Sequence, residues 1–177
     1  MAKPLKPNEI MDAIGNVEVF ASEKIAGFKG LRAKGDFAAN AKIFDVDGQL
    51  VPVRTLRTLQ LDENLHIDPV TREGQPELGY YLNHSCDANA YAFVTQHGPL
   101  PVLRIYALKA IRKGQEITVD YAFMESEIAH ACKCCCGALR CRRKLVGFKQ
   151  LSAQEVQAYL DGKVPVSKHL LDLLVVH

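Results

Sequence analysis

Cysteines crowd near the C-terminal end of the chain, and their spacing is typical of a metal site. Five of the six cysteines of this 177-residue sequence fall within positions 132–141. Cys134, Cys136 and Cys141 form a C-x-C-x4-C pattern in which a glycine follows the second cysteine and permits a tight turn. Because structural zinc takes four nitrogen or sulfur ligands, the pattern predicts a zinc site and leaves one ligand open. The candidates for that ligand are His130, Cys132, Cys135 and the distant Cys86.

A second group of chemically active side chains lies far upstream, in the stretch Asn83-His-Ser-Cys86, with Asn89 three positions further on. This short irregular segment carries an amide, an imidazole, a hydroxyl and a thiol. Its thiol belongs to the only cysteine in the first 131 residues. We therefore interpret Cys86 as a candidate ligand that joins this segment to the C-terminal cysteines. The alternatives are reduced cysteines without a metal, or a redox pair, which the lack of a C-x-x-C on a βαβ pattern disfavours.

Composition limits the class of protein. With 48% hydrophobic and 24% charged residues, the chain is typical of one globular domain with small appendages. The net charge of +2 is too small to indicate nucleic-acid or membrane binding. The first ten residues contain no apolar core of a secretory signal, and no apolar run approaches the roughly 20 residues of a membrane span. We expect an intracellular protein that is not secreted, with metal rather than disulfides at its clustered thiols.

The elements that must position these residues are short strands. Apolar stretches bounded by turn residues predict strands at 17–20, 41–46, 50–53, 56–61, 90–95, 102–107 and 117–121, with a turn at 47–48 between the second and third. No βαβ alternation is present, which argues against a doubly wound sheet and against a Rossmann-type methyltransferase.

The C-terminal part has a helical pattern. Ser152-Ala-Gln-Glu155 predicts a capping box, and Gly162 stands where that helix would stop. A second helix is predicted from about Ser167 to the end, with an apolar stripe that must pack on the body or on a partner. A short helix is also predicted at residues 9–14.

Three motifs in order resemble the SET-domain protein lysine methyltransferases. The stretch Asn83-His-Ser-Cys-Asp-Ala-Asn89 is similar to the N-H-S-C-x-P-N motif of that family. Gly114-Gln-Glu-Ile-Thr-Val-Asp-Tyr121 is similar to its G-E-E-L-T-x-D-Y segment. The Cys134, Cys136 and Cys141 pattern resembles its post-SET zinc motif. Residues Gly30–Ala33, Ile43–Phe44 and Gly48 match the opening strands of the family, so the resemblance covers roughly residues 17–148.

The resemblance implies a mainly β fold of the β-clip, SET-like type, with a few helices, several short curved sheets, a knot-like crossing, a C-terminal zinc knot and a helical tail. It also implies a division of the chain into an N-terminal leader (1–16), a SET-like domain (17–123), a post-SET zinc-binding segment (124–148) and a C-terminal helical extension (149–177).

The resemblance further implies an S-adenosylmethionine-dependent enzyme that methylates the side-chain amine of a lysine in a protein. Tyr121 would be the catalytic residue. The cofactor-binding residues would be Phe28, Lys29, Gly30, Leu31, Tyr81, Asn83, His84, Tyr121 and Leu139. The zinc ligands would be Cys86, Cys134, Cys136 and Cys141. The alternatives are a SET fold that acts on a small molecule and a non-catalytic binding module. We expect no direct nucleic-acid binding, no membrane association, and a monomer or homodimer.

Ala88 stands where the family motif has proline, and three further departures concern the cofactor loop and the channel. Phe28 stands at the first position of a glycine-rich cofactor loop, and Val46 replaces an expected tyrosine that would bind cofactor or line the channel. Val119 stands where many relatives carry an aromatic residue that limits the number of methyl groups added. The valine either widens the channel or leaves this task to Phe123 or Tyr80, so product multiplicity stays open.

Overall fold

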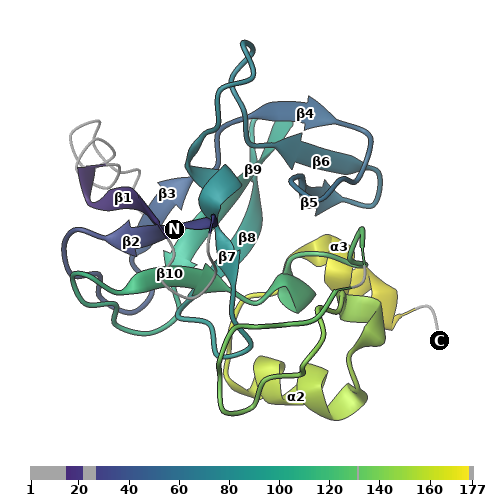
Figure 1. Ribbon diagram of the computed structural model, residues 1–177. Helices are drawn as coiled ribbons and strands as arrows, with labels where there is room; N and C mark the ends of the chain where they lie inside the picture. The colour runs from purple at the N-terminus through teal and green to yellow at the C-terminus, as the bar shows by residue number, and fades with distance from the viewer. Residues whose placement is uncertain (1–14, 22–26, 131, 176–177) are drawn as a thin grey trace.

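The computed structural model describes residues 15–21, 27–130 and 132–175. Within them the chain folds into three small β-sheets, and two short helices pack together beneath one end of the sheets (Figure 1). This confirms the mainly β fold. The helix predicted at 9–14 lies outside the described residues. None of the described helices is long and apolar enough to cross a bilayer.

The first sheet joins the two ends of the SET-like region. Its strands lie in the order β1 (Val17–Ala21), β2 (Lys29–Ala33), β10 (Glu116–Val119) and β7 (Asn83–His84). The pairs β1–β2 and β2–β10 are antiparallel, whereas β7 runs parallel to β10 with Asn83 opposite Thr118 and His84 opposite Val119. This parallel pair holds the Asn83–Cys86 segment beside the strand that leads into Tyr121.

The other two sheets are antiparallel. In the second, β9 (Leu100–Ala107) lies between β3 (Lys42–Asp45) and β8 (Ala90–His97), and a turn at Gly98 with φ of 64° joins β8 to β9. In the third, β6 (Leu65–Asp68) lies between β4 (Gln49–Val51) and β5 (Leu59–Asp62).

The turn predicted at 47–48 does not close a hairpin. The strands on its two sides, β3 and β4, belong to different sheets, and β4 pairs with β6 instead. Gly48 lies where the chain passes from β3 to the edge of β6. A Cβ atom at this position would lie 2.2 Å from the carbonyl oxygen of Asp68. The chain therefore passes directly against the end of β6, and only glycine leaves room for this approach.

The main core lies between the sheets. The strands contribute side chains that are less than 2% exposed, among them Leu31, Ile43, Phe44, Ile105 and Ile117. Burial of one such side chain stabilises the fold by about 1.5–3 kcal/mol relative to its exposure. Strands this short cannot be stable alone, so the packing of the sheets on each other positions the site.

A second apolar cluster holds the C-terminal part. It comprises buried residues from η2 (Tyr121–Phe123), η3 (Phe148–Gln150), α2 (Ala153–Asp161) and α3 (Lys168–Leu171). The capping box predicted at Ser152 is present, and α2 ends at Gly162. The second helix is shorter than predicted, because α3 changes after four residues into the 3-10 turn η4 (Asp172–Leu174).

Candidate active site and metal centre

Asn89 fastens the Asn83–Cys86 segment to β10. Its side-chain Nδ2 donates a hydrogen bond of 2.8 Å to the carbonyl oxygen of Glu116, and its Oδ1 accepts one of 2.9 Å from the N–H of Thr118. The side-chain amide of Asn89 thus bonds two backbone groups of β10, as the backbone of a neighbouring strand would do. The N–H of Ser85 adds a 2.9 Å bond to the carbonyl oxygen of Val119. The motif spacing from Asn83 to Asn89 therefore has a structural reason as well as a chemical one.

The side chain of Asn83 ties β7 to β2. Its Nδ2 donates to the carbonyl oxygen of Lys29 at 3.1 Å and to Oε1 of Glu116 at 2.9 Å. A Cβ atom on Gly30 would lie 2.8 Å from this Nδ2 and 2.7 Å from Oε1 of Glu116. The glycine is therefore required for the close packing of β2 against Asn83, and the structure brings Lys29, Gly30 and Asn83 together as expected.

His84 faces both Tyr121 and the cysteines. Its Nδ1 accepts a hydrogen bond of 3.2 Å from the backbone N–H of Tyr121, and its Nε2 lies 3.2 Å from Sγ of Cys86. Desolvation, together with the nearby Arg142 guanidinium, lowers the pKa of His84 although Asp120 acts against this shift. Because Nδ1 accepts from the Tyr121 N–H, the neutral ring is assigned the tautomer with its proton on Nε2, which faces the Cys86 sulfur.

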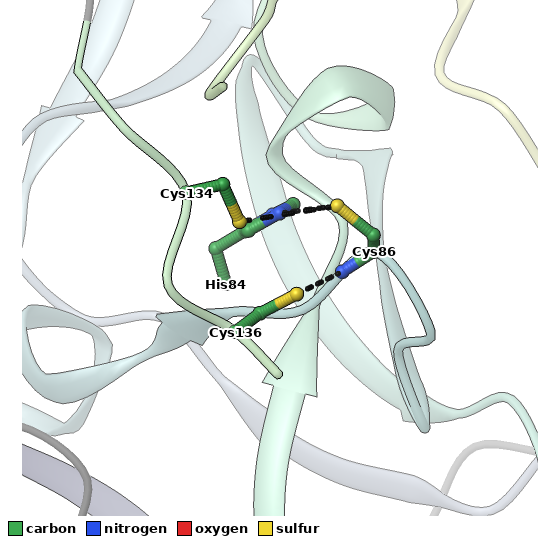
Figure 2. Close-up of side chains that lie close together, drawn as sticks. All are labelled: His84, Cys86, Cys134 and Cys136. Atoms are coloured by element: carbon green, nitrogen blue, oxygen red, sulfur yellow. Dashed lines mark hydrogen bonds between the residues drawn. The ribbon is translucent and has the colours of Figure 1, made fainter. Parts of the chain in front are cut away.

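Four potential metal ligands converge beneath β7. The ligand atoms of His84, Cys86, Cys134 and Cys136 all lie within 4.8 Å of one another (Figure 2). The Sγ atoms of Cys86 and Cys134 are 3.9 Å apart. Zinc–thiolate bonds of about 2.3 Å in a tetrahedron require sulfur atoms roughly 3.8 Å apart. The donor set and its spacing therefore fit zinc, and the structure brings Cys86 to the C-terminal cysteines as expected.

Backbone N–H groups point at the sulfur atoms of this cluster. The N–H of Cys86 donates to Sγ of Cys136 at 3.5 Å, and the N–H of Arg142 donates to Sγ of Cys86 at 3.5 Å. Although burial opposes its ionisation, hydrogen bonds from the backbone of Cys86 and Ala138 and from the neighbouring thiols lower the pKa of Cys136. Such donors stabilise a thiolate, which is the form that binds metal.

The fourth ligand has two candidates, Cys141 and His84. The Cys141 thiol interacts with the thiols of Cys134 and Cys136 and accepts a 3.3 Å bond from the N–H of Arg143, but it is outside the tightest group of ligand atoms. His84 is inside that group, which the sequence did not indicate. Its Nε2 carries the proton, however, so it is suited to donate to the Cys86 thiolate rather than to ligate.

Arg142 lies next to the cysteine centre and directs its guanidinium to two carboxylates. Its Nη1 is 2.8 Å from Asp120 Oδ2, and its Nε is 2.9 Å from Glu155 Oε1. The carboxylate of Asp120 also caps η2 by accepting from the N–H of Ala122 at 3.1 Å. The ion pairs thus connect the cysteine segment, the turn that carries Tyr121, and α2.

Tyr121 begins this turn, directly after β10. Its hydroxyl donates a 2.7 Å hydrogen bond to the carbonyl oxygen of Leu82, and its ring lies 5.2 Å from the ring of His84. Desolvation, and then the negative charge of Glu125, raises the pKa of the phenol far above its usual range. The hydroxyl is therefore a fixed neutral donor at physiological pH and cannot act as a base.

A cavity of about 140 Å³ opens beside Tyr121. Its walls come from the 54–59 loop, from η1 (Leu78–Tyr81) and from the segment after η2. Of the two aromatic residues considered for the channel, Tyr80 lines this cavity. Phe123 does not, because its ring stacks on Tyr159 and packs against Phe148 in the second apolar cluster.

The remaining predicted cofactor residues differ in exposure. Phe28 is 59% exposed and Leu139 is 98% exposed, so both offer apolar surface. Tyr81 is half-buried, with the Lys29 ammonium 5.9 Å from its ring centroid. Leu31 is fully buried in the core, and its side chain therefore cannot contact a cofactor. The structure thus groups Tyr81, Lys29 and the Asn83 segment.

Comparison with known proteins identifies the class. Residues 28–122 match the SET domain, which is more than half of the chain. The protein therefore belongs to the SET-domain family, and the resemblance to this family is confirmed for the region that contains the Asn83–Asn89 and Gly114–Tyr121 motifs.

The relatives are much larger proteins. A histone-lysine N-methyltransferase specific for H3 lysine-36 from Yarrowia lipolytica is 30% identical over 176 residues, which cover 90% of this chain and 22% of the relative. The histone-lysine N-methyltransferase trr of Drosophila melanogaster is 28% identical over 137 residues, covering 70% of this chain and 6% of the relative. The crystal structure of KRYPTONITE with mCHG DNA and SAH superposes with a TM-score of 0.61 at 24% identity, over 73% of this chain and 29% of that chain. This likeness shows the SET fold.

Proposed function

We propose that the protein is an S-adenosylmethionine-dependent methyltransferase that acts on the side-chain amine of a lysine in a protein. The observation that carries this proposal is the position of Tyr121, whose hydroxyl is fixed on Leu82 at the wall of a cavity in a SET-domain fold. The relatives, which are histone-lysine methyltransferases by name, support a protein substrate. A related structure holds an H3(1-15) peptide, which supports it further. Histones as substrates also favour an intracellular location.

The bound cosubstrate would supply an electrophilic methyl group on a sulfonium. We assign its binding to Phe28, Lys29, Gly30, Tyr81, Asn83, His84, Tyr121 and Leu139, with Leu31 restricted to its backbone. Exposed apolar side chains beside amide and imidazole groups suit a nucleoside with a charged amino-acid tail. Alignment of the lysine amine with the methyl group at about 3–3.5 Å would provide much of the rate enhancement. Tyr121 would position both groups without adding charge.

We further propose that Cys86, Cys134, Cys136 and Cys141 hold a structural zinc ion, with His84 donating a hydrogen bond to the Cys86 thiolate. This site would join the Asn83–Cys86 segment to the post-SET segment at 124–148. The division into a leader (1–16), a SET-like domain (17–123) and a helical extension (149–177) is kept in this proposal, with Ala122 and Phe123 packing into the second apolar cluster.

Incubation with radiolabelled S-adenosylmethionine and a cell extract tests the activity. We expect label in a protein band, and loss of at least 100-fold in turnover for Tyr121→Phe with cosubstrate affinity nearly unchanged. Tyr106→Phe, a half-buried tyrosine on β9, is the matched control. Label confined to small molecules would favour a small-molecule substrate, and no binding of S-adenosylmethionine by calorimetry would leave a non-catalytic binding module.

A further inference from the structure

Glu125 shares the cavity beside Tyr121. Its backbone N–H donates to the carbonyl oxygen of Tyr121 at 2.9 Å, so the turn η2 fixes the two residues relative to each other. Its side chain is 9% exposed, and both residues line the cavity described above. A carboxylate at this depth needs a reason, since burial of a charge without full compensation is costly.

Only one of the two carboxylate oxygens of Glu125 accepts a hydrogen bond from the described residues. Its Oε1 accepts a 2.9 Å hydrogen bond from the backbone N–H of Gln60 on β5. Its Oε2 is buried and accepts no hydrogen bond from any residue that the structure describes. The nearest cation is the Nε of Arg54 at 3.8 Å, which is too long for a hydrogen bond.

Arg54 is held by other partners. Its NH2 donates to Oγ of Ser126 at 2.8 Å, and its NH1 contacts Glu127 at 3.4 Å. Its Nε makes no hydrogen bond with any described residue and lies 3.8 Å from Oε2, so the guanidinium forms an ion pair with Glu125 without donating a hydrogen bond to Oε2. Tyr121 and Glu125 both line the cavity, so a phenol that cannot accept a proton lies in the same wall as a carboxylate whose Oε2 is buried and accepts no hydrogen bond from the described residues.

We propose that Glu125 is a catalytic residue whose Oε2 accepts the proton of the substrate's lysine ammonium. This inference rests on the proposed function. The lysine enters as R–NH₃⁺ with Glu125 as carboxylate, and proton transfer gives R–NH₂ and the neutral carboxylic acid. The freed nitrogen lone pair then forms the bond to the methyl carbon while the carbon–sulfur bond breaks, with its electrons on sulfur. The acid afterwards returns its proton to solvent through the mouth of the cavity.

The acidity of Glu125 suits this role. Desolvation raises its pKa to about 8, although the Gln60 N–H and Arg54 act in the opposite direction. A lysine amine has an ordinary pKa near 10.4, so at neutral pH less than about 1% of it is free base. A base with a pKa near the working pH is the most effective proton acceptor.

Other ionisable groups face the same cavity. They are Arg54, Arg57, Tyr80, Tyr121, Glu127, His130 and Cys132. His130→Gln and Cys132→Ser are therefore the control variants for any pH effect, because each removes a titratable group and leaves Glu125 in place.

The first test compares Glu125→Gln with the wild type on the labelled protein substrate found in the extract. Glutamine retains a carbonyl oxygen for the Gln60 N–H, so the structural bond survives. We expect kcat/KM to fall about 100-fold at pH 7.5. We also expect it to keep rising to about pH 10, whereas the wild type levels off above about pH 8. In Arg54→Gln the pH at which kcat/KM levels off should be higher than in the wild type, because Arg54 lowers the pKa of Glu125. If kcat/KM of Glu125→Gln stays within threefold of wild type and has the same pH dependence, the proposal is overturned.

The second test needs no activity. The carboxyl resonance of Glu125, assigned by its absence in Glu125→Gln, is titrated in ¹³C-glutamate-labelled protein with and without n-butylammonium, a mimic of the lysine side chain. We expect n-butylammonium, which donates N–H hydrogen bonds as well as providing charge, to lower the titration midpoint more than tetramethylammonium, which provides charge alone. An unchanged midpoint with both salts would refute the role of Glu125. A wild type without transferase activity would instead refute the proposed function, and the two failures are therefore distinguishable.

Discussion

Replacement of Asn89 tests whether one amide holds the Asn83–Cys86 segment in place. In Asn89→Ala, the carbonyl oxygen of Glu116 and the N–H of Thr118 both lose their partners, which lie at 2.8 and 2.9 Å in the native protein. Both groups belong to β10, which lies between β2 and β7, so water cannot reach them freely. A backbone group left unpaired costs more than the net value of the lost bond.

The magnitude follows from these two groups. At about 1–3 kcal/mol for each unsatisfied group, Asn89→Ala should destabilise the protein by roughly 2–6 kcal/mol. For a domain with a total stability of about 5–15 kcal/mol, this is a large fraction. At about 2–4 °C per kcal/mol for a chain of this size, Tm should fall by at least 4 °C. Asn89→Asp keeps the acceptor for Thr118 and loses the donor to Glu116, so it should lie between wild type and Asn89→Ala.

Urea unfolding with zinc present in all samples measures this effect. Gln96→Ala is the matched control, because its amide donates to the Gly98 carbonyl oxygen on the exposed β8–β9 turn and should change stability by less than about 0.5 kcal/mol. If Asn89→Ala unfolds within 1 kcal/mol of wild type, the amide does not carry the pairing and the reasoning is wrong.

Three further predictions concern the metal, the ion pairs and the buried acid. Cys86→Ser should bind well below one zinc per chain by atomic absorption and unfold at lower temperature, whereas the exposed Cys135→Ser should match wild type in both. Arg142→Ala should cost about 3–5 kcal/mol in urea unfolding, because it leaves the buried Asp120 carboxylate unpaired, and adding Asp120→Asn should recover part of the loss. Glu125, with a pKa of about 8 instead of 4.5, keeps in the folded state a proton that the unfolded chain releases. Wild-type stability should therefore fall as pH rises from about 4.5 to 8, and Glu125→Gln should lack this fall; identical pH dependence of the two proteins would contradict the buried acid.

The strands were predictable where they are long and bounded by turn residues. The apolar runs at 90–95 and 102–107 correspond to β8 and β9, and the turn between them contains Gly98 with positive φ. β7 has only two residues, and the alternating Leu65-His-Ile-Asp68 of β6 is too short to distinguish a strand from a loop on its own. They form because neighbouring strands supply their hydrogen-bond partners, and this information is not local in the sequence.

The site was predictable to the extent that a motif fixes it. Cys86 lies with Cys134 and Cys136, as the resemblance to the family implied, although the spacing of the cysteines alone had left several candidates open. Leu31 was predicted to bind cofactor because residues 30–33 match the family's opening strand. In the structure its side chain lies on the face of β2 that packs into the core. Glu125 carried no signal, because its burial depends on Gln60, which lies 65 positions earlier on another sheet.

The position of His84 suggests why the cysteine centre and the candidate catalytic turn lie so close together. One neutral ring accepts from the N–H of Tyr121 at 3.2 Å and directs its other nitrogen to the Cys86 sulfur at 3.2 Å. Loss of the metal would therefore free the Cys86 side chain. The His84 ring would then lose its fixed orientation, and the N–H of Tyr121 would lose its hydrogen-bond acceptor. The Asp120–Arg142 ion pair provides a second connection between the same two segments. With two short connections, a structural ion in this fold would act on the geometry of Tyr121 although it takes no part in the chemistry.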